Sequence, residues 1–411
     1  MRRVKIEMRE VKNLVLVISS VCLSLIAVEI ALRLFATRLP LRFQKYLPED
    51  VKILAQSSKR GKLPRAYVAI LGDSYAVGQG DWYDEAIRQD PFGNPPFHSA
   101  HVIHELTGMD VVTFGTPGAE SADGIVYRPV SLVDMLRSRG VGVEMPSRVV
   151  IYFYEGNDFR GNLKFLERYW DANEGEYTTE AMTRLFEKIF SAGPRADGLI
   201  EGLRHLKVMK RFYVSKLVWV LARDLALMLS DSEDDSVAEK DQLVHLKIPA
   251  TSLRPPVRLQ APPLWFDTET TRKSLFVLEE SMRYATRYFN GSTFLIVYIP
   301  SPLVSYDLES ASVKVGPPDG TGRIYSVSEI HRKSDELCNQ VALVASRVGS
   351  TFLDLRPFVR LRAKAHPVHG PNDWHHFNRL GYEALGSAVA DSLRRTGSMP
   401  PSCQIIDLPR Q

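Results

Sequence analysis

Two short strings, far apart in the sequence, carry side chains that could together turn a serine into a nucleophile. Ser74 closes the string Leu-Gly-Asp-Ser directly after an apolar run at 67–70, and the string Asp-Trp-His-His begins at Asp373, about 300 residues later. A serine hydroxyl attacks readily only when an imidazole takes its proton, and the imidazole needs a carboxylate to fix its tautomer and orientation. The residue types therefore predict a Ser-His-Asp triad with Asp373 as its acid.

A third string supplies a donor for the negative charge that such a reaction develops. Asn157 lies in Tyr-Glu-Gly-Asn-Asp, which closes the apolar run at 149–153, so a predicted strand delivers its amide to the same rim as Ser74. An N–H group aimed at a developing oxyanion stabilises the transition state. Each string also has an ordinary structural interpretation: Gly-Asp-Ser as a turn, Asn-Asp as a local cap, and adjacent histidines as capping or surface residues.

Taken in order along the chain, these strings resemble the sequence blocks of the SGNH, or GDSL-type, hydrolases, a family of esterases, lipases, deacetylases and some acyltransferases. Four strings carry the resemblance: Gly72-Asp73-Ser74; Thr113-Phe114-Gly115-Thr116-Pro117-Gly118; Gly156-Asn157-Asp158; and Asp373-Trp374-His375-His376 followed by Gly381. The resemblance implies Ser74 as nucleophile, and an oxyanion hole formed by the backbone N–H groups of Ser74 and Gly118 with the Asn157 amide. Four strings in family order, each at a predicted strand end, favour the catalytic interpretation.

The chain departs from the family pattern at three points. Thr113 replaces a common asparagine, which matters little if the backbone of that block does the chemistry, and Phe377 stands where a proline often follows the histidine. Two histidines also compete for the role of base. Counting three residues on from Asp373, or five back from Gly381, selects His376, whereas the Asp-x-His spacing of the related alginate-acetylating branch selects His375. Two counts against one favour His376.

Apolar runs and helical patterns alternate beyond residue 66 and predict the scaffold. We expect strands at 67–71, 110–114, 148–154, 293–299 and 351–355, and helices at 98–107, 129–139, 272–289, 327–347 and 379–395. Such alternation indicates a parallel sheet with helices on both faces, whose sites form at the carboxyl ends of the strands. The predicted fold class is α/β: a three-layer sandwich around a central parallel five-stranded sheet, of the SGNH or flavodoxin-like type.

The predicted domain organisation follows from these elements and the segments between them. It comprises a cytoplasmic tip and transmembrane anchor at 1–36, a stalk at 37–65, an SGNH hydrolase-like domain at 66–400 and a tail at 401–411. More than 130 residues separate Asp158 from the strand at 293, which predicts a large helical insertion at about 160–290. We expect a helix at 180–191 and an amphipathic helix at 211–230, the latter packed on the domain or, alternatively, acting as a lid or membrane-lying element.

The amino terminus favours a membrane anchor. Five basic residues precede a run from Leu14 to Phe35 whose only charged residues are Glu29 and Arg33. A bilayer needs about 20 apolar residues, whereas the core of a cleaved signal peptide has only about 7–15 and ends at a small-residue site. The excess of basic residues before the span mildly favours a cytoplasmic amino terminus.

Composition excludes some classes of protein. The chain has 411 residues, 45% of them hydrophobic and 24% charged, with a formal net charge of +4, which indicates a globular protein and gives no sign of nucleic-acid binding. No cofactor motif is present, and His98, His101 and His104 lack the carboxylate or cysteine cluster that would complete a metal site. Cys338 and Cys403 could pair in an oxidising compartment or remain free.

The sequence thus predicts a single-pass protein of the bacterial inner membrane with a catalytic domain in the periplasm or outside the cell. Its expected reaction is hydrolysis of an ester, an O-acyl or O-acetyl group on a small molecule, glycan or lipid, without cofactor or metal. One alternative is an O-acyltransferase of cell-surface polysaccharide that uses the same triad. A second is a non-catalytic carbohydrate-binding or assembly protein that retains the fold. Protein partners are not indicated.

Overall fold

The computed structural model describes residues 2–35, 38–44, 47, 49–170, 176–192, 214, 244–248, 251–255, 258–316, 322–395 and 403. The chain divides into two compact units. The first comprises Met1–Gln56, Phe92–Asn94 and Ala196–Ser232, and the second comprises Ser57–Pro91, Pro95–Arg195 and Glu233–Gln411. All the residues of the predicted site belong to the second unit.

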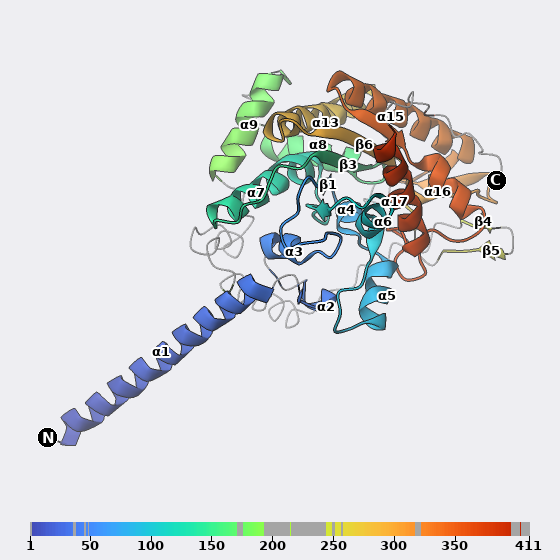
Figure 1. Ribbon diagram of the computed structural model, residues 1–411. Coiled ribbons are helices and arrows are strands. Elements are labelled where there is room, and N and C mark those ends of the chain that lie inside the picture. Colours follow the sequence, from blue (N-terminus) through green and yellow to red (C-terminus); the bar gives the residue numbers. More distant parts are fainter. Residues whose placement is uncertain are drawn as a thin grey trace. The chain divides into compact units, whose positions relative to one another are not determined.

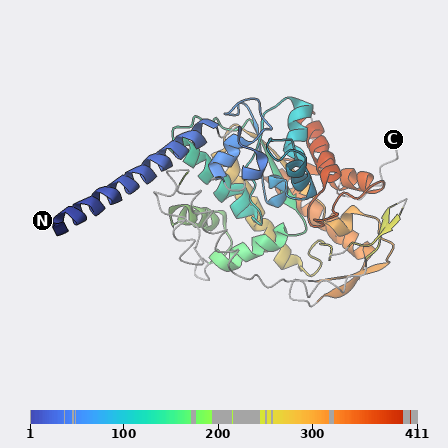
Figure 2. The same cartoon turned by 90° about the horizontal axis from the view of Figure 1, so that it is seen from below.

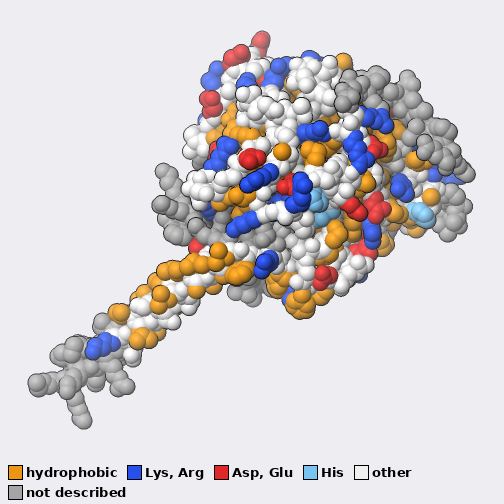
Figure 3. Space-filling model, in the orientation of Figure 1, with side chains coloured by type: hydrophobic (Ala, Val, Ile, Leu, Met, Phe, Trp, Pro, Cys, Tyr) orange, Lys and Arg blue, Asp and Glu red, His pale blue; other side chains and the backbone are white. Residues whose placement is uncertain are grey.

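The first unit contains the predicted anchor. Among its described residues are the helices α1 (Arg2–Phe35), α2 (Leu41–Gln44) and α3 (Glu49–Ala55). Within the described residues, α1 is the one helix that is long and apolar enough to cross a membrane, over Lys12–Leu32. Most of its described hydrophobic side chains are exposed, and Figure 3 shows them along the length of this helix. The predicted membrane-spanning segment is therefore present, on grounds of length and composition.

One acidic side chain on α1 is an exception to this exposure. Glu29 is almost fully buried, and its Oε2 accepts a hydrogen bond from the backbone N–H of Val214 at 3.0 Å, within the same unit. A carboxylate in an apolar span needs such a donor, because an unpaired charge there is costly.

The second unit is built around the predicted sheet. Five parallel strands lie in the order β2-β1-β3-β6-β9. Their bounds are β1 (Val68–Leu71), β2 (Val111–Thr113), β3 (Arg148–Tyr154), β6 (Thr293–Ile299) and β9 (Thr351–Asp354). Each strand lies within a residue or so of its predicted position. The prediction of an α/β fold with a central five-stranded parallel sheet is confirmed.

Both faces of the sheet are buried, which explains why its strands are continuous apolar runs. Tyr152 of β3 joins a hydrophobic core with Ala100 of α6 and Leu385 of α17, whereas its neighbours Ile151 and Phe153, on the opposite face, are also buried. One face is covered by α6 (His98–Thr107), α16 (Arg356–Ala363) and α17 (Arg379–Arg394). The other is covered by α7 (Arg128–Ser138), α8 (Asp158–Tyr169), α13 (Thr268–Tyr288) and α15 (Val327–Arg347) (Figure 1). Helices α6 and α17, far apart in the sequence, lie side by side in both ribbon views (Figures 1 and 2).

The helices of this unit follow the predicted positions closely and include several that were not predicted. The predicted ones are α6 (His98–Thr107), α7 (Arg128–Ser138), α9 (Thr179–Ala192), α13 (Thr268–Tyr288), α15 (Val327–Arg347) and α17 (Arg379–Arg394). The additional ones are α4 (Ser74–Val77), α5 (Asp81–Gln89), α8 (Asp158–Tyr169), α14 (Pro302–Ser305), α16 (Arg356–Ala363) and a π-helical segment, Ala122–Tyr127, before α7. Two antiparallel hairpins, β4 (Leu246–Ile248) with β5 (Thr251–Leu253) and β7 (Ser312–Val315) with β8 (Arg323–Ser326), were also not predicted.

The expected insertion at about 160–290 is described only in part. Helix α13 packs against α8 and α15 in the layer over the sheet. The helix expected at 211–230 lies outside the described residues apart from Val214. The insertion and its role remain predictions.

The two cysteines outside the apolar segment form a disulfide. Cys338 of α15 is joined to Cys403, with 5.7 Å between their Cα atoms, and both residues are buried. The link attaches Cys403 to the helical layer. This resolves the alternative that the sequence left open.

Deleting residues 1–36 should convert a membrane-associated, detergent-requiring protein into one that remains in the aqueous phase. The deletion removes the apolar span of α1 and leaves every strand of the sheet intact. Carbonate extraction of membranes that carry the full or shortened chain measures the change, with circular dichroism as the control for folding. A folded, shortened chain that stays in the membrane fraction would instead indicate a second membrane-binding element, for which 211–230 is the candidate.

Candidate active site

The predicted site residues follow the carboxyl ends of three adjacent strands. Ser74 comes after β1, Gly118 after β2 and Asn157 after β3, and β1 lies between the other two in the sheet. The connection that follows β1 leads to β2 on one side, and the connection that follows β3 leads to β6 on the other, so the direction reverses between β1 and β3. Open α/β sheets place their ligands at such a point. The topology therefore brings these residues to one rim.

The turn that carries Ser74 depends on Gly72 and Asp73. Gly72 has φ +138°, and a Cβ at this position would lie 2.6 Å from the carbonyl oxygen of Tyr152, so a side chain cannot be accommodated. Asp73 caps helix α4 by accepting the backbone N–H of Tyr75 at 2.9 Å. Ser74 is the first residue of α4, so its own N–H has no partner within the helix.

His376 bridges the serine and the acid. Its Nε2 lies 2.9 Å from Ser74 Oγ, and its Nδ1 lies 2.6 Å from Asp373 Oδ2. The other carboxylate oxygen of Asp373 accepts the backbone N–H groups of His375 at 2.9 Å and His376 at 3.2 Å. Burial alone would raise the pKa of Asp373, but the hydrogen bond and charge of His376, with these N–H groups, lower it to about 2. The arrangement has the geometry of a Ser-His-Asp triad.

The structure brings His376, and not His375, to the serine. The backbone oxygen of His375 accepts a hydrogen bond from the Tyr75 hydroxyl at 2.9 Å. This bond joins the turn that carries Ser74 to the histidine loop, the segment before α17 that carries Asp373 and His376. The Tyr75 ring packs against Phe377, with 5.1 Å between centroids. Phe377, which stands where the resembled family often has a proline, is fully buried. Its side chain therefore contributes to the packing around this loop.

Asn378 fixes both ends of the histidine loop. Its Nδ2 donates to the carbonyl oxygens of Pro367, His369 and Gly370, while its Oδ1 accepts the N–H groups of Leu380 and Gly381 at the start of α17. One amide thus closes the loop and caps the helix that follows. The sequence signal for this role is an Asn directly before a helical pattern.

The predicted oxyanion donors lie at the same rim with one unexpected contact. Gly118 has φ +70° in the turn formed by Thr116 and Ala119, and Thr116 N–H donates to the Gly72 carbonyl oxygen at 3.1 Å. Asn157 Nδ2 donates to Asp73 Oδ2 at 3.1 Å. A primary amide has two N–H groups, so the second can still point to an oxyanion. The Asp73 contact fixes the orientation of the amide.

Thr113 has a structural role that the sequence did not indicate. Its Oγ1 donates to the backbone oxygen of Ala76 in α4 and accepts the N–H of Gly115 at 3.2 Å. The side chain therefore joins the loop that carries Gly118 to the helix that carries Ser74. The expectation that only the backbone of this block matters was too narrow.

Three carboxyl groups close in sequence to the site residues have raised pKa values. Burial raises the pKa of Asp73, although the Tyr75 N–H and the Asn157 amide partly offset this effect. Burial, and then the charge of Asp73, raise the pKa of Asp158 well above its usual range. Asp158 Oδ2 accepts the N–H of Tyr154 at 2.8 Å, while Oδ1 has no partner among the described residues. Burial and nearby Asp123 raise the pKa of Glu120, two residues after Gly118, to about 7.

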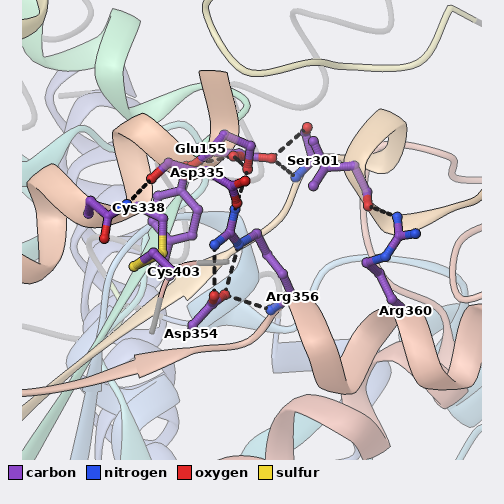
Figure 4. Close-up of polar contacts among 12 residues, drawn as sticks. Glu155, Ser301, Asp335, Cys338, Asp354, Arg356, Arg360 and Cys403 are labelled. Atoms are coloured by element: carbon purple, nitrogen blue, oxygen red, sulfur yellow. Dashed lines mark hydrogen bonds and ion pairs between the residues drawn. A yellow bond between two sulfur atoms is a disulfide. The ribbon is translucent and has the colours of Figure 1, made fainter. Parts of the chain in front are cut away.

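Another buried carboxyl group near the site is fully paired. Glu155, two residues before Asn157, accepts hydrogen bonds from Tyr298, from Ser334 and, through both N–H and Oγ, from Ser301, at 2.6–2.8 Å. Ser334 in turn accepts from Arg356 at 3.1 Å. Figure 4 shows Glu155, Ser301 and Arg356 of this network. It connects the loop that carries Asn157 to β6 and α15.

Arg356 extends the network to two further acids. It pairs with Asp354 through two nitrogens, at 2.8 and 2.9 Å, and with Asp335 at 2.6 Å (Figure 4). Ligand atoms of Asp354, Cys338 and Cys403 lie within 4.8 Å of one another, but the sulfurs are bonded to each other and the carboxylate is engaged by Arg356. This group therefore offers no ready set of metal ligands.

Comparison of the chain with protein-family models, with curated proteins and with solved structures finds no match in any of the three. A functional interpretation has to be built on the geometry of the site itself. That geometry unites every residue of the predicted triad on one rim.

Replacing Glu120 by Gln should change how stability depends on pH. Because the pKa of Glu120 is raised from 4.5 to about 7, the folded chain binds this proton more tightly than the unfolded chain does. Stability is therefore lost as pH rises between these values, and Glu120→Gln removes that loss. We expect the midpoint of thermal unfolding to match the unmodified chain at about pH 4, below both pKa values, and to exceed it at about pH 8.

Glu167→Gln is the matched control, because it removes the same charge from an exposed position on α8. The control should leave the pH dependence as it is in the unmodified chain. Parallel stability curves for Glu120→Gln and the control would contradict the assignment.

Proposed function

We propose that this chain is a membrane-anchored serine hydrolase of the SGNH type, which cleaves an ester through an acyl-enzyme. The observation that carries the proposal is the contact of His376 with both Ser74 Oγ, at 2.9 Å, and Asp373, at 2.6 Å. Segments about 300 residues apart supply these groups, so local structure alone does not explain their meeting. The substrate class is an O-acyl or O-acetyl ester of a carbohydrate or lipid.

The chemistry follows from these contacts. Ser74 Oγ attacks the ester carbonyl carbon as His376 Nε2 takes its proton, and the imidazolium is stabilised by Asp373, which stays ionised because its pKa is about 2. The tetrahedral intermediate collapses when His376 returns the proton to the leaving alcohol, which breaks the ester bond. Water then attacks the acyl-serine, with His376 again as base, and the carboxylic acid leaves as Ser74 recovers its proton.

Charge on the tetrahedral intermediate would be stabilised by the N–H groups at the strand ends. Candidate donors are the backbone N–H groups of Ser74 and Gly118 and the second N–H of Asn157, whose first is held by Asp73. Each such donor contributes about 3 kcal/mol to transition-state stabilisation in well-studied enzymes. Preorganisation by Thr113 and Asp73 keeps the donors in place before the charge develops.

The proposed location is the bacterial inner membrane, with the catalytic unit in the periplasm or outside the cell. Helix α1 supplies a single-pass anchor. The disulfide between Cys338 and Cys403 supports an oxidising compartment, because such bonds are rare in the cytosol. Basic residues before the span favour a cytoplasmic amino terminus.

Ser74 should react covalently with a fluorophosphonate probe, because only a base-activated serine beside oxyanion donors attacks such reagents readily. Intact-mass spectrometry of the labelled chain, followed by peptide mapping, measures the adduct. Ser74→Ala should abolish labelling. An adduct that persists in this variant would assign the nucleophile elsewhere.

His376→Ala should lower kcat on a short-chain aryl ester by roughly 10⁴- to 10⁶-fold, as the loss of a triad base does. His375→Ala is the matched neighbour: its contact with Tyr75 uses the backbone oxygen, which the substitution keeps. It should retain most of the activity. The reverse ranking would transfer the role of base to His375.

Hydrolysis and acyl transfer differ in whether water or a sugar hydroxyl attacks the acyl-serine. Trp170, one aromatic that could have stacked on a sugar, instead packs against Tyr177 and Phe276. Trp265, by contrast, is exposed. If water is the acceptor, as proposed, acetate release should exceed acetylation of a polysaccharide offered as acceptor to the purified full chain. Acceptor acetylation that outruns acetate release would replace the hydrolase with an O-acyltransferase, with the triad unchanged.

A further inference from the structure

We propose that Asp81 is a positioning residue of the site: it holds the loop that presents Asp373 to His376. The inference deepens the proposed function, on which it rests. Asp81 lies in the first turn of α5, seven residues after Ser74, and is 7% exposed. The sequence strings that predicted the triad do not include it.

Both carboxylate oxygens of Asp81 bind the histidine loop. Oδ2 accepts the backbone N–H groups of Asn372 at 3.0 Å and Asp373 at 3.4 Å, and Oδ1 accepts Asn372 Nδ2 at 2.9 Å. The backbone N–H of the triad acid is thus held from one side, while its carboxylate binds His376 on the other. Removing Asp81 would leave three donors without this partner.

The contact belongs to a short segment that supports the whole loop. Gly80 has φ +128°, and a Cβ there would lie 2.4 Å from the Phe377 backbone oxygen and 3.2 Å from His376 Cβ. The backbone oxygen of Gln79 accepts the hydroxyl of Tyr382, on α17, at 2.7 Å. The residues from Ser74 to Asp81 therefore carry the nucleophile and also form the surface on which the base and acid rest.

An acidic residue in the first turn of a helix has an ordinary explanation, because it interacts favourably with the helix dipole. Asp84, in the first turn of the same helix, is exposed and fits that explanation. Asp81 differs because the hydrogen bonds of its side chain go to the loop, 291 and 292 residues away in the sequence. Its position is therefore explained by the loop.

The first measurement is steady-state kinetics of the full chain on a short-chain aryl ester. Displacing a catalytic group by about 1 Å can cost about 100-fold in rate, so Asp81→Ala should lower kcat by about 10- to 100-fold with KM changed less than about twofold. Asp81→Asn keeps an oxygen for the two backbone N–H groups and should lose less. Asp84→Ala and Asp84→Asn, the matched controls, should leave both constants unchanged.

The second measurement reads the acid and base directly. A short hydrogen bond such as that between His376 Nδ1 and Asp373 gives a far-downfield proton resonance in NMR spectra. In Asp81→Ala this resonance should move upfield or broaden away, in Asp81→Asn it should shift less, and in Asp84→Ala it should stay in place. His376→Ala identifies the signal. General destabilisation of a chain that is still folded would not change it.

The outcomes separate this inference from the proposed function. If the unmodified chain neither labels at Ser74 nor hydrolyses esters, the proposed function fails, while the NMR shift still decides whether Asp81 positions Asp373. If Asp81→Ala does not fold, Asp81→Asn carries both measurements. A folded Asp81→Ala with unchanged kcat and an unchanged resonance overturns the inference, as does an equal effect of the Asp84 variants.

Discussion

The site depends on one contact across the chain, the hydrogen bond between Ser74 Oγ and His376 Nε2, whose residues are 302 positions apart. One hydrogen bond contributes only about 1 kcal/mol net and cannot hold two segments together. Burial must do so: α17, which follows the histidine loop, packs on α6 and on the sheet face beside β1. The hydroxyls of Tyr75 and Tyr382 then set the register, each bonding a backbone oxygen of the opposite segment. Packing supplies the energy and these polar contacts supply the alignment.

Two neighbouring carboxyl groups at the end of β3 show how differently the fold treats buried acids. Glu155 accepts four hydrogen bonds and lies near the cation Arg356, so every oxygen is satisfied. Asp158, three residues later, has one oxygen without a partner among the described residues. A half-satisfied buried acid destabilises the fold, whereas a fully satisfied one stabilises a particular arrangement. Asp158, the less favourably placed of the two, is the one whose pKa is raised by burial and then by the charge of Asp73, next to Ser74. Unfavourable arrangements of this kind are commonly retained at functional sites.

The sequence predicted the strands and most of the helices well, because their burial follows a simple pattern. It predicted the contacts of the site less completely. Strands such as β3 and β6 are apolar runs because both faces are covered, and α15 begins at a capping box that Ser326 and Glu329 form. Helix α8 was missed because it starts inside the Asn157 string and contains Gly161. Spacing alone selected His376 over His375. The contacts of Asp73, Thr113 and Asp81 could not be predicted, because each joins segments that only the folded sheet brings together.

Two aspartates near the serine, Asp73 and Asp373, lie in environments that shift their pKa values in opposite directions. Asp373 is kept ionised by His376 and two backbone N–H groups, with a pKa of about 2, whereas burial raises the pKa of Asp73, the residue directly before Ser74. A second fully ionised carboxylate this close to the nucleophile would repel the oxyanion that forms in the proposed reaction. The negative charge of Asp373 lies behind the imidazole, where it stabilises the imidazolium, whereas burial of Asp73 disfavours charge beside the serine. The hydrogen bond from the Asn157 amide partly offsets the effect of burial on Asp73, so the contact that orients this proposed oxyanion donor also lowers the cost of burying the acid.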